Sequence, residues 1–482
     1  MRTCREMGIR TVAVYSEPDE SAMHVRYADE AYSLEGSKAS DTYLNQQKIL
    51  AIANRVKADA IHPGYGFLSE NPEFAESVAS AGLNFVGPSG SSIRALGDKT
   101  AARTRAQELG IPTVPGTEHP LLSEHEAIET AARIGYPVLL KAAAGGGGKG
   151  MRIVGAETDL LSALRAARSE AEGAFGDGRV YMEKYVESPR HIEMQVVADG
   201  YGKALYLGER ECSIQRRHQK VIEETPSPVV DEPLRQNLGE AAIKLIRSAG
   251  YVNAGTVEFL VDRAMNFYFL EVNTRLQVEH PVTEFVTGLD LVQEQILIAQ
   301  GERLSREQGE VRRIGHALEC RIYAEDPAEG FFPSTGVLKR YRLPEGPRVR
   351  VDNGFREGDA VSSFYDPMLA KVVTWGATRA ESIAVMNRAL SEFLVVGVQT
   401  TIPFCQFVVN HSAFQHGDFS TDFVKQQFSP ELMNRLQDDE RLFLLAASAW
   451  LHQNGATHST QHAETERLPR SKWKAKNEAS HR

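Results

Sequence analysis

The stretch from Glu271 to Glu279 carries the densest group of side chains in this sequence that could do chemistry. Glu271 and Glu279 supply carboxylates, Asn273 supplies an amide and Arg275 a guanidinium. Carboxylates can hold a cation or accept a proton, and a guanidinium can bind a planar anion through two parallel hydrogen bonds. The stretch is therefore a candidate site for both metal binding and acid–base chemistry.

The residues around Glu271 predict a β-hairpin, because two runs rich in β-branched and aromatic residues flank a polar turn. Pairing Asp262 with Phe267 across this turn places Glu258 directly opposite Glu271. Asn273 lies two residues further along the strand and therefore shares the same face.

Carboxylates that face each other across a sheet destabilise it, and a cation between them removes the penalty. Two carboxylates and an amide oxygen are hard oxygen ligands of the kind that Mg²⁺ prefers. The hairpin therefore predicts that Glu258, Glu271 and Asn273 bind Mg²⁺ or Mn²⁺, with water and nucleotide phosphates as further ligands. The alternative is a surface hairpin with scattered acids and no ion.

A glycine-rich loop at residues 145–148 follows a predicted strand that ends near Lys141 and precedes a second strand. The pattern GxxxxGK[ST] fails here, because Ala143 and Gly150 stand where it requires glycine and Ser or Thr. The arrangement instead predicts a mobile flap whose N–H groups close over phosphates, with charge from Lys141 and Lys149. A flexible hairpin loop without a ligand is the alternative.

Three further segments suit a nucleotide. Residues 180–186 read as a strand whose free N–H and C=O groups could bind an adenine edge, and Lys99 lies near the start of a predicted helix, where anions bind. In the donor-rich stretch 211–220, strict alternation puts Gln215 and His218 on opposite faces of a strand. The chain must therefore bend there if both residues serve one site.

Length and composition indicate a multidomain globular protein. The 482 residues correspond to about three domains. A net charge of −10 argues against a nucleic-acid surface. The four cysteines lie far apart, which argues against disulfides and a zinc site and favours a reducing cytoplasm. No apolar run approaches the length of a membrane span.

The N-terminal region alternates helices and strands, which predicts a parallel sheet. Residues 1–7 read as the end of a helix, 9–15 as a buried strand and 42–53 as a helix, with short strands at 60–61 and 84–87. An α/β domain normally opens with a strand and a turn before its first helix. We therefore expect this domain to be truncated, with an in-frame upstream start that encodes the missing strand.

Several of these motifs strongly resemble those of biotin carboxylase, a member of the ATP-grasp superfamily, over about residues 5–430. The matching motifs are Gly97–Lys99, Lys141–Ala142 with the glycine loop, Glu183–Val186, Gln215–Lys220 and Glu271–His280. The stretches 211–222 and 271–283 match nearly residue for residue, which makes the resemblance highly specific.

The resemblance implies a role for each matched position. It implies nucleotide contacts by Lys99, Lys141, Gly147, Gly148, Glu183, Lys184, Tyr185, Val186, His191, Gln215 and His218. It implies the metal ligands Glu258, Glu271 and Asn273, in agreement with the hairpin register. It implies that Lys220, Arg275 and Val278 contact bicarbonate, that Glu279 is the base, and that Arg321 contacts biotin.

The implied reaction is the ATP-dependent carboxylation of biotin, with bicarbonate as the carbon source. Glu279 would deprotonate bicarbonate, which then attacks the γ-phosphate to give carboxyphosphate. Carboxyphosphate would decay to CO₂ and phosphate behind the glycine lid, which excludes water. The phosphate would take the proton from the ureido nitrogen of biotin, and Arg321 would stabilise the enolate-like oxygen.

The implied fold combines α/β and α+β domains. We expect a truncated parallel α/β domain at 1–96 and an ATP-grasp domain at 97–300, whose mobile lid covers about 114–187. We expect a mixed C-terminal domain at 301–430. A helix at 431–452 and a disordered polar tail at 453–482 follow.

The chain has no Ala-Met-Lys-Met biotin attachment motif. The biotin carboxyl carrier protein and the carboxyltransferase must then be separate chains, and family members usually form homodimers. For a free-standing subunit, acetyl-CoA carboxylase and fatty acid synthesis are favoured over propionyl-CoA, methylcrotonyl-CoA or pyruvate complexes. The alternatives to this enzyme are another ATP-grasp ligase that joins a carboxylate to an amine, and a catalytically inactive binding subunit.

Overall fold

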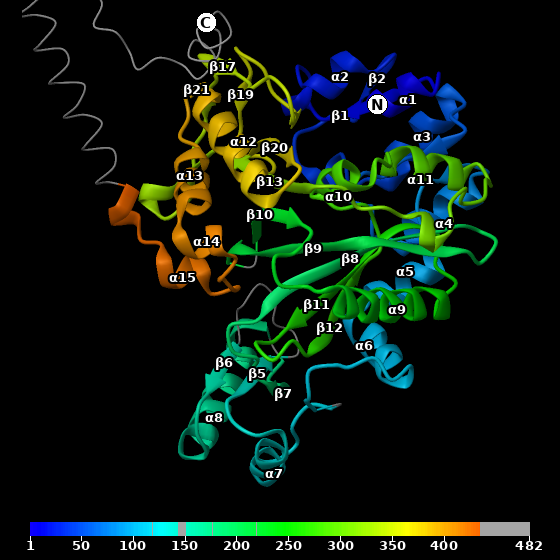
Figure 1. Ribbon diagram of the computed structural model, residues 1–482. Coiled ribbons are helices and arrows are strands. Elements are labelled where there is room, and N and C mark those ends of the chain that lie inside the picture. Colours follow the sequence, from blue (N-terminus) through cyan, green and yellow to red (C-terminus); the bar gives the residue numbers. More distant parts are fainter. Residues whose placement is uncertain (118, 143–150, 176, 218, 434–482) are drawn as a thin grey trace, which may run out of the picture. The chain divides into compact units, whose positions relative to one another are not determined.

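The centre of the fold is an eight-stranded antiparallel sheet, seen in the computed structural model of Figure 1. The structure describes residues 1–117, 119–142, 151–175, 177–217 and 219–433, and residues 1–430 form one compact unit. In sheet order the strands are β12 (Phe267–Asn273), β11 (Asn253–Val261), β8 (Arg190–Ala198), β9 (Ala204–Arg216), β10 (Gln219–Thr225), β13 (His316–Tyr323), β20 (Met368–Gly376) and β18 (Val349–Asn353).

Helix α9 (Glu232–Ser248) packs on strands β8 and β9 of this sheet. Its start is set by Asp231, whose side chain accepts the N–H of Leu234, and by a proline in the first turn. Leu238 and Leu245 on its inner face are fully buried in a core that also takes apolar residues from β8 and β11. The apolar face of α9 therefore fixes the position of the strands that carry the central residues of the site.

A separate three-stranded sheet of order β6-β5-β7 forms the predicted lid region. It contains β5 (Val138–Ala142), β6 (Met151–Val154) and β7 (Val180–Lys184), with α7 (Glu124–Ile134) and α8 (Glu157–Phe175) packed against it (Figure 1). β5 pairs with β6 in antiparallel register, which confirms the predicted strand–loop–strand arrangement. The glycine loop itself, with Gly147 and Gly148, lies outside the described residues.

The N-terminal region contains two parallel strand pairs, β1 (Val12–Tyr15) with β2 (Glu30–Ser33) and β3 (Ala60–Ile61) with β4 (Asn84–Phe85). The parallel direction was predicted, whereas strand β2 was not. Its helices are α1 (Arg2–Glu6), α2 (Met23–Tyr27), α3 (Gln46–Val56), α4 (Pro72–Ser80), α5 (Gly90–Gly97) and α6 (Lys99–Glu108). The prediction of a helix that opens at Lys99 is confirmed, with Asp98 as its cap.

Two N-terminal predictions need correction. The segment predicted as a buried strand at 9–15 is a shorter strand in which only Ala13 is buried, because β1 pairs only with β2 within the described ranges. The helix predicted at 42–53 begins at Gln46, because the Asn45 side chain accepts the N–H of Lys48 and caps the helix there.

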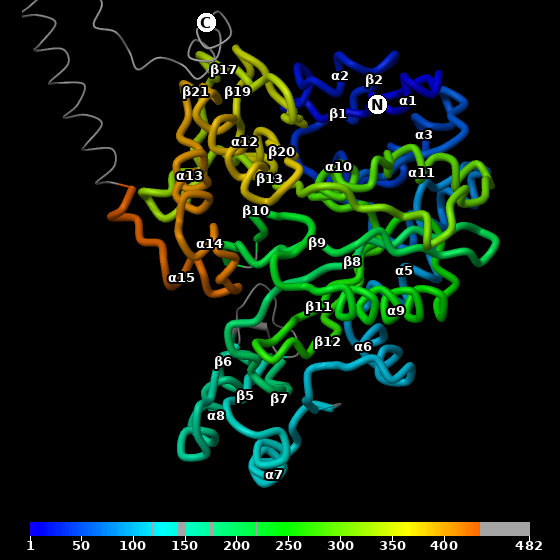
Figure 2. The backbone as a smooth tube through the Cα atoms, in the orientation of Figure 1, coloured from blue at the N-terminus to red at the C-terminus, as the bar shows by residue number. Residues whose placement is uncertain are grey.

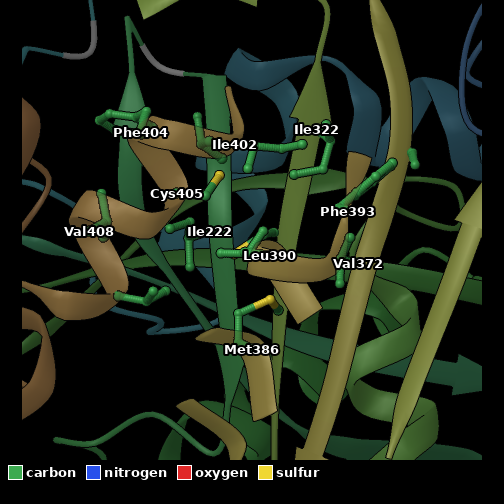
Figure 3. Close-up of a cluster of buried hydrophobic side chains, with 14 of the residues drawn as sticks. Ile222, Ile322, Val372, Met386, Leu390, Phe393, Ile402, Phe404, Cys405 and Val408 are labelled. Carbon is green, nitrogen blue, oxygen red and sulfur yellow. The ribbon is translucent and has the colours of Figure 1, made fainter. Parts of the chain in front are cut away.

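The C-terminal region packs helices on the outer strands of the large sheet. Figure 3 shows Ile222 of β10, Ile322 of β13 and Val372 of β20 facing Met386 and Leu390 of helix α12. The helices are α12 (Arg379–Glu392), α13 (Ile402–Asn410), α14 (Ser412–His416) and α15 (Phe423–Gln427). The remaining strands are β14 (Glu325–Asp326), β15 (Phe332–Pro333), β16 (Gly336–Val337), β17 (Arg340–Arg342), β19 (Ala360–Val361) and β21 (Leu394–Val396).

Two helices connect β12 to β13, as the path of the chain in Figure 2 shows. Helix α11 (Leu291–Ala299) has Asp290 as the cap at its start. Helix α10 (His280–Thr287) was not predicted; it begins directly after Glu279 and packs on β13. Its Pro281 lies in the first turn, where the missing N–H has no helical partner to lose.

Among the described residues, no helix is both long and apolar enough to cross a membrane. The predicted helix at 431–452 and the tail at 453–482 lie outside the described residues from 434 onward.

Candidate active site

The hairpin of β11 and β12 places Glu258 directly opposite Glu271, as the sequence predicts. The route to this pairing differs from the expected one. Phe267 pairs with Val261, not with Asp262, and a register shift after Glu258 restores the expected pairing. A β-bulge of this kind inserts one residue into one strand and compensates for a loop that is one residue longer.

Glu258 is buried and lies within reach of four polar side chains. Its Oε1 accepts hydrogen bonds from Lys220 Nζ at 2.8 Å, Asn273 Nδ2 at 2.8 Å and Gln277 Nε2 at 3.0 Å. Its Oε2 lies 2.7 Å from Nε2 of His191. Burial alone would raise the pKa of Glu258, but Lys220 and His191 hold it well below its ordinary value.

Glu271 lies at the more exposed edge of the same pair, where Lys99 Nζ approaches its Oε2 to 2.6 Å. Asn273 turns its Oδ1 toward Arg275, which donates to it over 3.1 Å. The ligand set predicted for Mg²⁺ is therefore assembled, and each oxygen donor already has a basic or amide partner. Two facing carboxylates and an amide fit a hard divalent cation, which would take over charge compensation from these side chains.

Lys220 is the hub of the site. Its Nζ contacts Glu193, donates to Glu258 and to Glu279 at 2.8 Å each, and lies 3.3 Å from Gln277 Oε1. Three carboxylates around one buried ammonium raise the pKa of Lys220 well above its ordinary value, despite the opposing effect of burial. Lys220 is therefore a fixed positive charge between the predicted metal ligand Glu258 and Glu279.

Glu279 connects Lys220 of β10 with Arg321 of β13. Its Oε1 accepts from Lys220, and its Oε2 accepts from Arg321 Nη2 at 2.8 Å. Burial would raise the pKa of Glu279, but the cations of Lys220, Arg321 and Arg210 lower it far below its ordinary value. Glu279 is therefore an ionised carboxylate that touches both candidate substrate-binding cations.

Arg275 and Val278 lie between Asn273 and Glu279 in the chain and already have partners. The Nε of Arg275 donates to Glu70 at 2.7 Å, so one edge of its guanidinium is committed. The carbonyl of Val278 accepts a hydrogen bond from Lys371 Nζ. Only part of the Arg275 guanidinium is left for a bidentate contact with an anion.

Several predicted nucleotide contacts of the lid region already have partners within the chain. Lys141 and Arg103 both form ion pairs with Glu183, at 3.6 Å for Arg103 Nη1. The Lys184 side chain donates to two backbone carbonyls that precede β5, and the N–H groups of Lys184 and Tyr185 donate to other carbonyls. The N–H groups of Lys184 and Tyr185 are therefore not free, while the nucleotide contacts by Glu183, Lys184, Tyr185 and Val186 stay predictions.

The bend expected between Gln215 and His218 is present. β9 ends at Arg216 and β10 begins at Gln219, with Arg217 at a positive φ of 48° between them. Gln215 Nε2 lies 2.7 Å from His191 Nδ1, so these two predicted nucleotide contacts meet next to Glu258. His218 lies outside the described residues.

Family comparisons identify each part of the chain. Residues 1–93 match the model of the biotin carboxylase N-terminal domain and residues 319–426 that of its C-terminal domain. Residues 98–307 match the ATP-binding domain of the carbamoyl-phosphate synthase L chain. Biotin carboxylase 1 of Bacillus subtilis is 50% identical over 426 residues, which are 88% of this chain and 95% of that protein.

The chain belongs to the biotin carboxylase family. It is therefore an ATP-dependent ligase that forms a carbon–nitrogen bond and acts in a biotin-dependent carboxylase. One of the pyruvate carboxylase subunits of Methanothermobacter thermautotrophicus is 48% identical, over 94% of this chain and 92% of that protein.

A solved biotin carboxylase structure is also similar. It is the biotin carboxylase domain dimer of Hydrogenobacter thermophilus 2-oxoglutarate carboxylase, in complex with magnesium ADP, ADP and bicarbonate. It matches with a TM-score of 0.82 and 45% identity, over 88% of this chain and 94% of that one. The fold predicted from the motifs is thus the biotin carboxylase fold with its ATP-grasp domain.

Sequence reasoning missed several residues of this biotin carboxylase site. Glu193 and Arg210 form a fully buried ion pair beneath Lys220, and Glu70 fixes Arg275. Glu223 pairs with Arg321 from the neighbouring strand. The available signal was charge inside apolar strands, because a buried charge requires a partner, but the sequence does not say which strands are neighbours.

Proposed function

We propose that this chain carboxylates biotin on a biotin carboxyl carrier protein, with ATP and bicarbonate as substrates and carboxyphosphate as the intermediate. One observation carries the proposal: Glu279 bridges Lys220 through one oxygen and Arg321 through the other. One carboxylate thus touches a cation suited to bicarbonate and a cation suited to biotin. The two half-reactions would meet at this residue.

In the first half-reaction, Lys220 and Arg275 would hold bicarbonate beside Glu279. Glu279 is ionised and can accept the bicarbonate proton, which makes the anion a nucleophile for the γ-phosphate of ATP. The attack forms the new carbon–oxygen–phosphorus link of carboxyphosphate and releases ADP. Glu70 supports this step, because it fixes the Nε edge of Arg275.

In the second half-reaction, carboxyphosphate would split into CO₂ and phosphate, and the phosphate would take the ureido proton of biotin. The ureido oxygen gains negative charge as the nitrogen attacks CO₂. Arg321 would be the donor to that oxygen, because it is a buried cation held in place by Glu223 and Glu279. The bond between the ureido nitrogen and the carbon of CO₂ is the new carbon–nitrogen bond of the ligase reaction.

Nucleotide and metal binding would use the residues on the other side of Lys220. Glu258, Glu271 and Asn273 would hold Mg²⁺ or Mn²⁺, which supplies charge neutralisation during phosphoryl transfer when bound. His191, Gln215, Lys99 and Lys141 would contact ATP, together with the stretch at Glu183. The magnesium ADP and bicarbonate in the Hydrogenobacter structure support this ligand set.

The complex we favour is acetyl-CoA carboxylase, in fatty acid biosynthesis in the cytoplasm. The chain would work as a homodimer with separate carrier and carboxyltransferase chains; the dimer in the Hydrogenobacter structure supports the homodimer. A pyruvate carboxylase complex is the second candidate, because the Methanothermobacter relative from such an enzyme is 48% identical over nearly the whole chain. Propionyl-CoA and methylcrotonyl-CoA complexes are further candidates, and the carboxyltransferase that co-purifies with the chain would decide between them all.

The division of labour between Glu279 and Arg321 gives the test. Glu279→Ala should lose bicarbonate-stimulated ATP hydrolysis and biotin carboxylation together, because no base remains for bicarbonate. Arg321→Ala should retain bicarbonate-stimulated ATP hydrolysis but lose carboxylation by about 10²–10³-fold, as expected when one donor to a developing oxyanion is removed. Phosphate release and carboxybiotin formation are measured in parallel.

An unrelated, partly buried arginine provides the control. Arg379 is paired with the buried Glu224 on the opposite face of the sheet, so Arg379→Ala controls for the loss of an arginine from a buried glutamate. The proposed division is wrong if Arg321→Ala loses both activities equally. It is also wrong if Glu279→Ala still hydrolyses ATP in response to bicarbonate.

A further inference from the structure

A second pair of facing carboxylates lies in the large sheet, next to Arg321. Glu223 of β10 is paired directly opposite Glu319 of β13, and both side chains are fully buried. Figure 3 shows that Ile222 and Ile322 point into the apolar core with helix α12. Because side chains alternate along a strand, Glu223, Glu319 and Arg321 share the opposite face, toward the candidate active site.

Glu223 holds one edge of the Arg321 guanidinium. Its Oε1 lies 2.6 Å from both Nε and Nη2 of Arg321. Nη2 also donates to Glu279, so this edge of the guanidinium is anchored on two carboxylates. The remaining nitrogen, Nη1, has a long contact of 3.5 Å with the hydroxyl of Tyr323. The contacts therefore fix the plane of the guanidinium and leave Nη1 the least engaged donor.

Glu319 does not compete for Arg321. Neither of its carboxyl oxygens has a hydrogen-bond partner among the described residues, although it is fully buried. Burial raises the pKa of Glu319 well above its ordinary value, and the nearby Glu223 raises it further. A buried carboxyl group without a partner is stable only as the neutral acid.

The other charged and titratable groups near Glu223 and Glu319 have partners of their own. Lys371 of β20 lies opposite Arg321, and it donates to the Val278 carbonyl. The two titratable groups of α10, His280 and Glu284, bond to the Gln277 carbonyl and to Arg350. The carboxyl groups in contact with the Arg321 guanidinium are those of Glu223 and Glu279.

We propose that Glu223 is the positioning residue for Arg321 in the biotin half-reaction. This inference rests on the proposed function, because it assigns a role to the residue behind the biotin contact. Glu223 would hold the Nε–Nη2 edge, so that Nη1 points to the place where the ureido oxygen becomes negative. It would take no part in bicarbonate activation, which uses Lys220, Arg275 and Glu279.

Glu223→Gln tests the proposal, because the amide has the shape of the carboxylate but not its charge. With free biotin as the substrate, kcat for carboxylation should fall by about 10–100-fold, the effect expected when a catalytic donor is misplaced. Bicarbonate-stimulated ATP hydrolysis should stay within about threefold of wild type, and KM for ATP should not change. This split between two activities of one protein is not produced by a general loss of stability.

Glu224→Gln is the matched control. Glu224 is the next residue of the same strand and equally buried, but it faces the other way and bonds to His316 and Arg379. Its substitution should lower the melting temperature without separating the two activities. Glu223→Asp is the second variant; it keeps the charge but withdraws it by one methylene, so a smaller loss of carboxylation should occur with the same split.

The outcomes are distinct. Equal loss of both activities in Glu223→Gln and Glu223→Asp, or no loss in either, overturns the positioning role while the proposed function stands. A wild-type protein that neither hydrolyses ATP in response to bicarbonate nor carboxylates biotin overturns the proposed function, and this inference with it.

Discussion

Replacement of Lys220 by methionine should destabilise the protein strongly, because the lysine compensates a cluster of buried acids. Its Nζ lies 2.8 Å from both Glu258 and Glu279 and also contacts Glu193. One such contact is worth about 6 kcal/mol at an effective dielectric constant of about 20, before the cost of desolvation. Removal of one partner from a buried ion pair costs about 3–5 kcal/mol, and we expect a loss of at least that size.

The loss should depend on pH in a defined direction. In the wild type, the pKa values of Glu258 and Glu279 are lowered by Lys220, so these carboxylates stabilise the fold above their ordinary pKa of 4.5. That contribution disappears as the pH falls. Without Lys220, burial raises the pKa of both groups, and ionisation then opposes folding. The difference in stability between wild type and Lys220→Met should therefore be largest at pH 8 and shrink toward pH 5.

Denaturant unfolding of the ligand-free protein at several pH values measures this difference. Lys203→Met is the control, because Lys203 has an exposed acidic partner in Glu307, and surface pairs contribute about 0–1 kcal/mol. The reasoning is refuted if Lys220→Met is as stable as Lys203→Met at pH 8. It is also refuted if the deficit grows as the pH is lowered.

Two further predictions follow from the facing carboxylate pairs. Glu271→Gln should severely weaken the use of Mg²⁺-ATP and leave the fold intact, since it removes one of two facing charges. ATP turnover at limiting Mg²⁺ measures this effect, and unchanged turnover would rule out the metal site. Glu319→Gln should make the protein more stable than wild type above pH 4.5. The pKa of Glu319 is raised in the folded protein, so the free energy of unfolding of the wild type falls as the pH rises from 4.5 toward this raised pKa. The loss is at most about 1.4 kcal/mol per pH unit. Urea unfolding at several pH values, with exposed Glu357→Gln as the control, measures the second effect, and parallel curves for wild type and Glu319→Gln would contradict it.

The sequence was most informative where function and local geometry coincide. The pairing of Glu258 with Glu271 follows from the period of two in a strand and from the short turn between the runs. The predicted turn is one residue too short, and a bulge corrects the register before the acids are reached. The prediction of the pair is therefore confirmed although the assumed hairpin loop is wrong.

Contacts between distant strands could not be predicted in the same way. Glu223 and Arg321 are neighbours because β13 returns to the edge of β10 after helix α9, the β11–β12 hairpin and helices α10 and α11. A period of two assigns each residue to a face, but it does not say which strand lies alongside. For the same reason the Glu193–Arg210 pair and the Glu70–Arg275 pair could not be found from the sequence, although each charge in an apolar or glycine-rich setting indicated that a partner exists.

The low pKa of Glu279 limits how the proposed base can work. A carboxylate held by two cations is reliably ionised, but it is a weak proton acceptor for the same reason. Bound bicarbonate would raise the pKa of Glu279, because an anion between Lys220 and Arg275 competes for the ammonium group that stabilises the Glu279 carboxylate. Proton transfer from bicarbonate would also strengthen the attraction of the resulting dianion to Lys220, which stays charged because its pKa is raised. Glu279 would therefore become an effective base only when bicarbonate is bound, and the ligand-free enzyme would keep it unprotonated and ready.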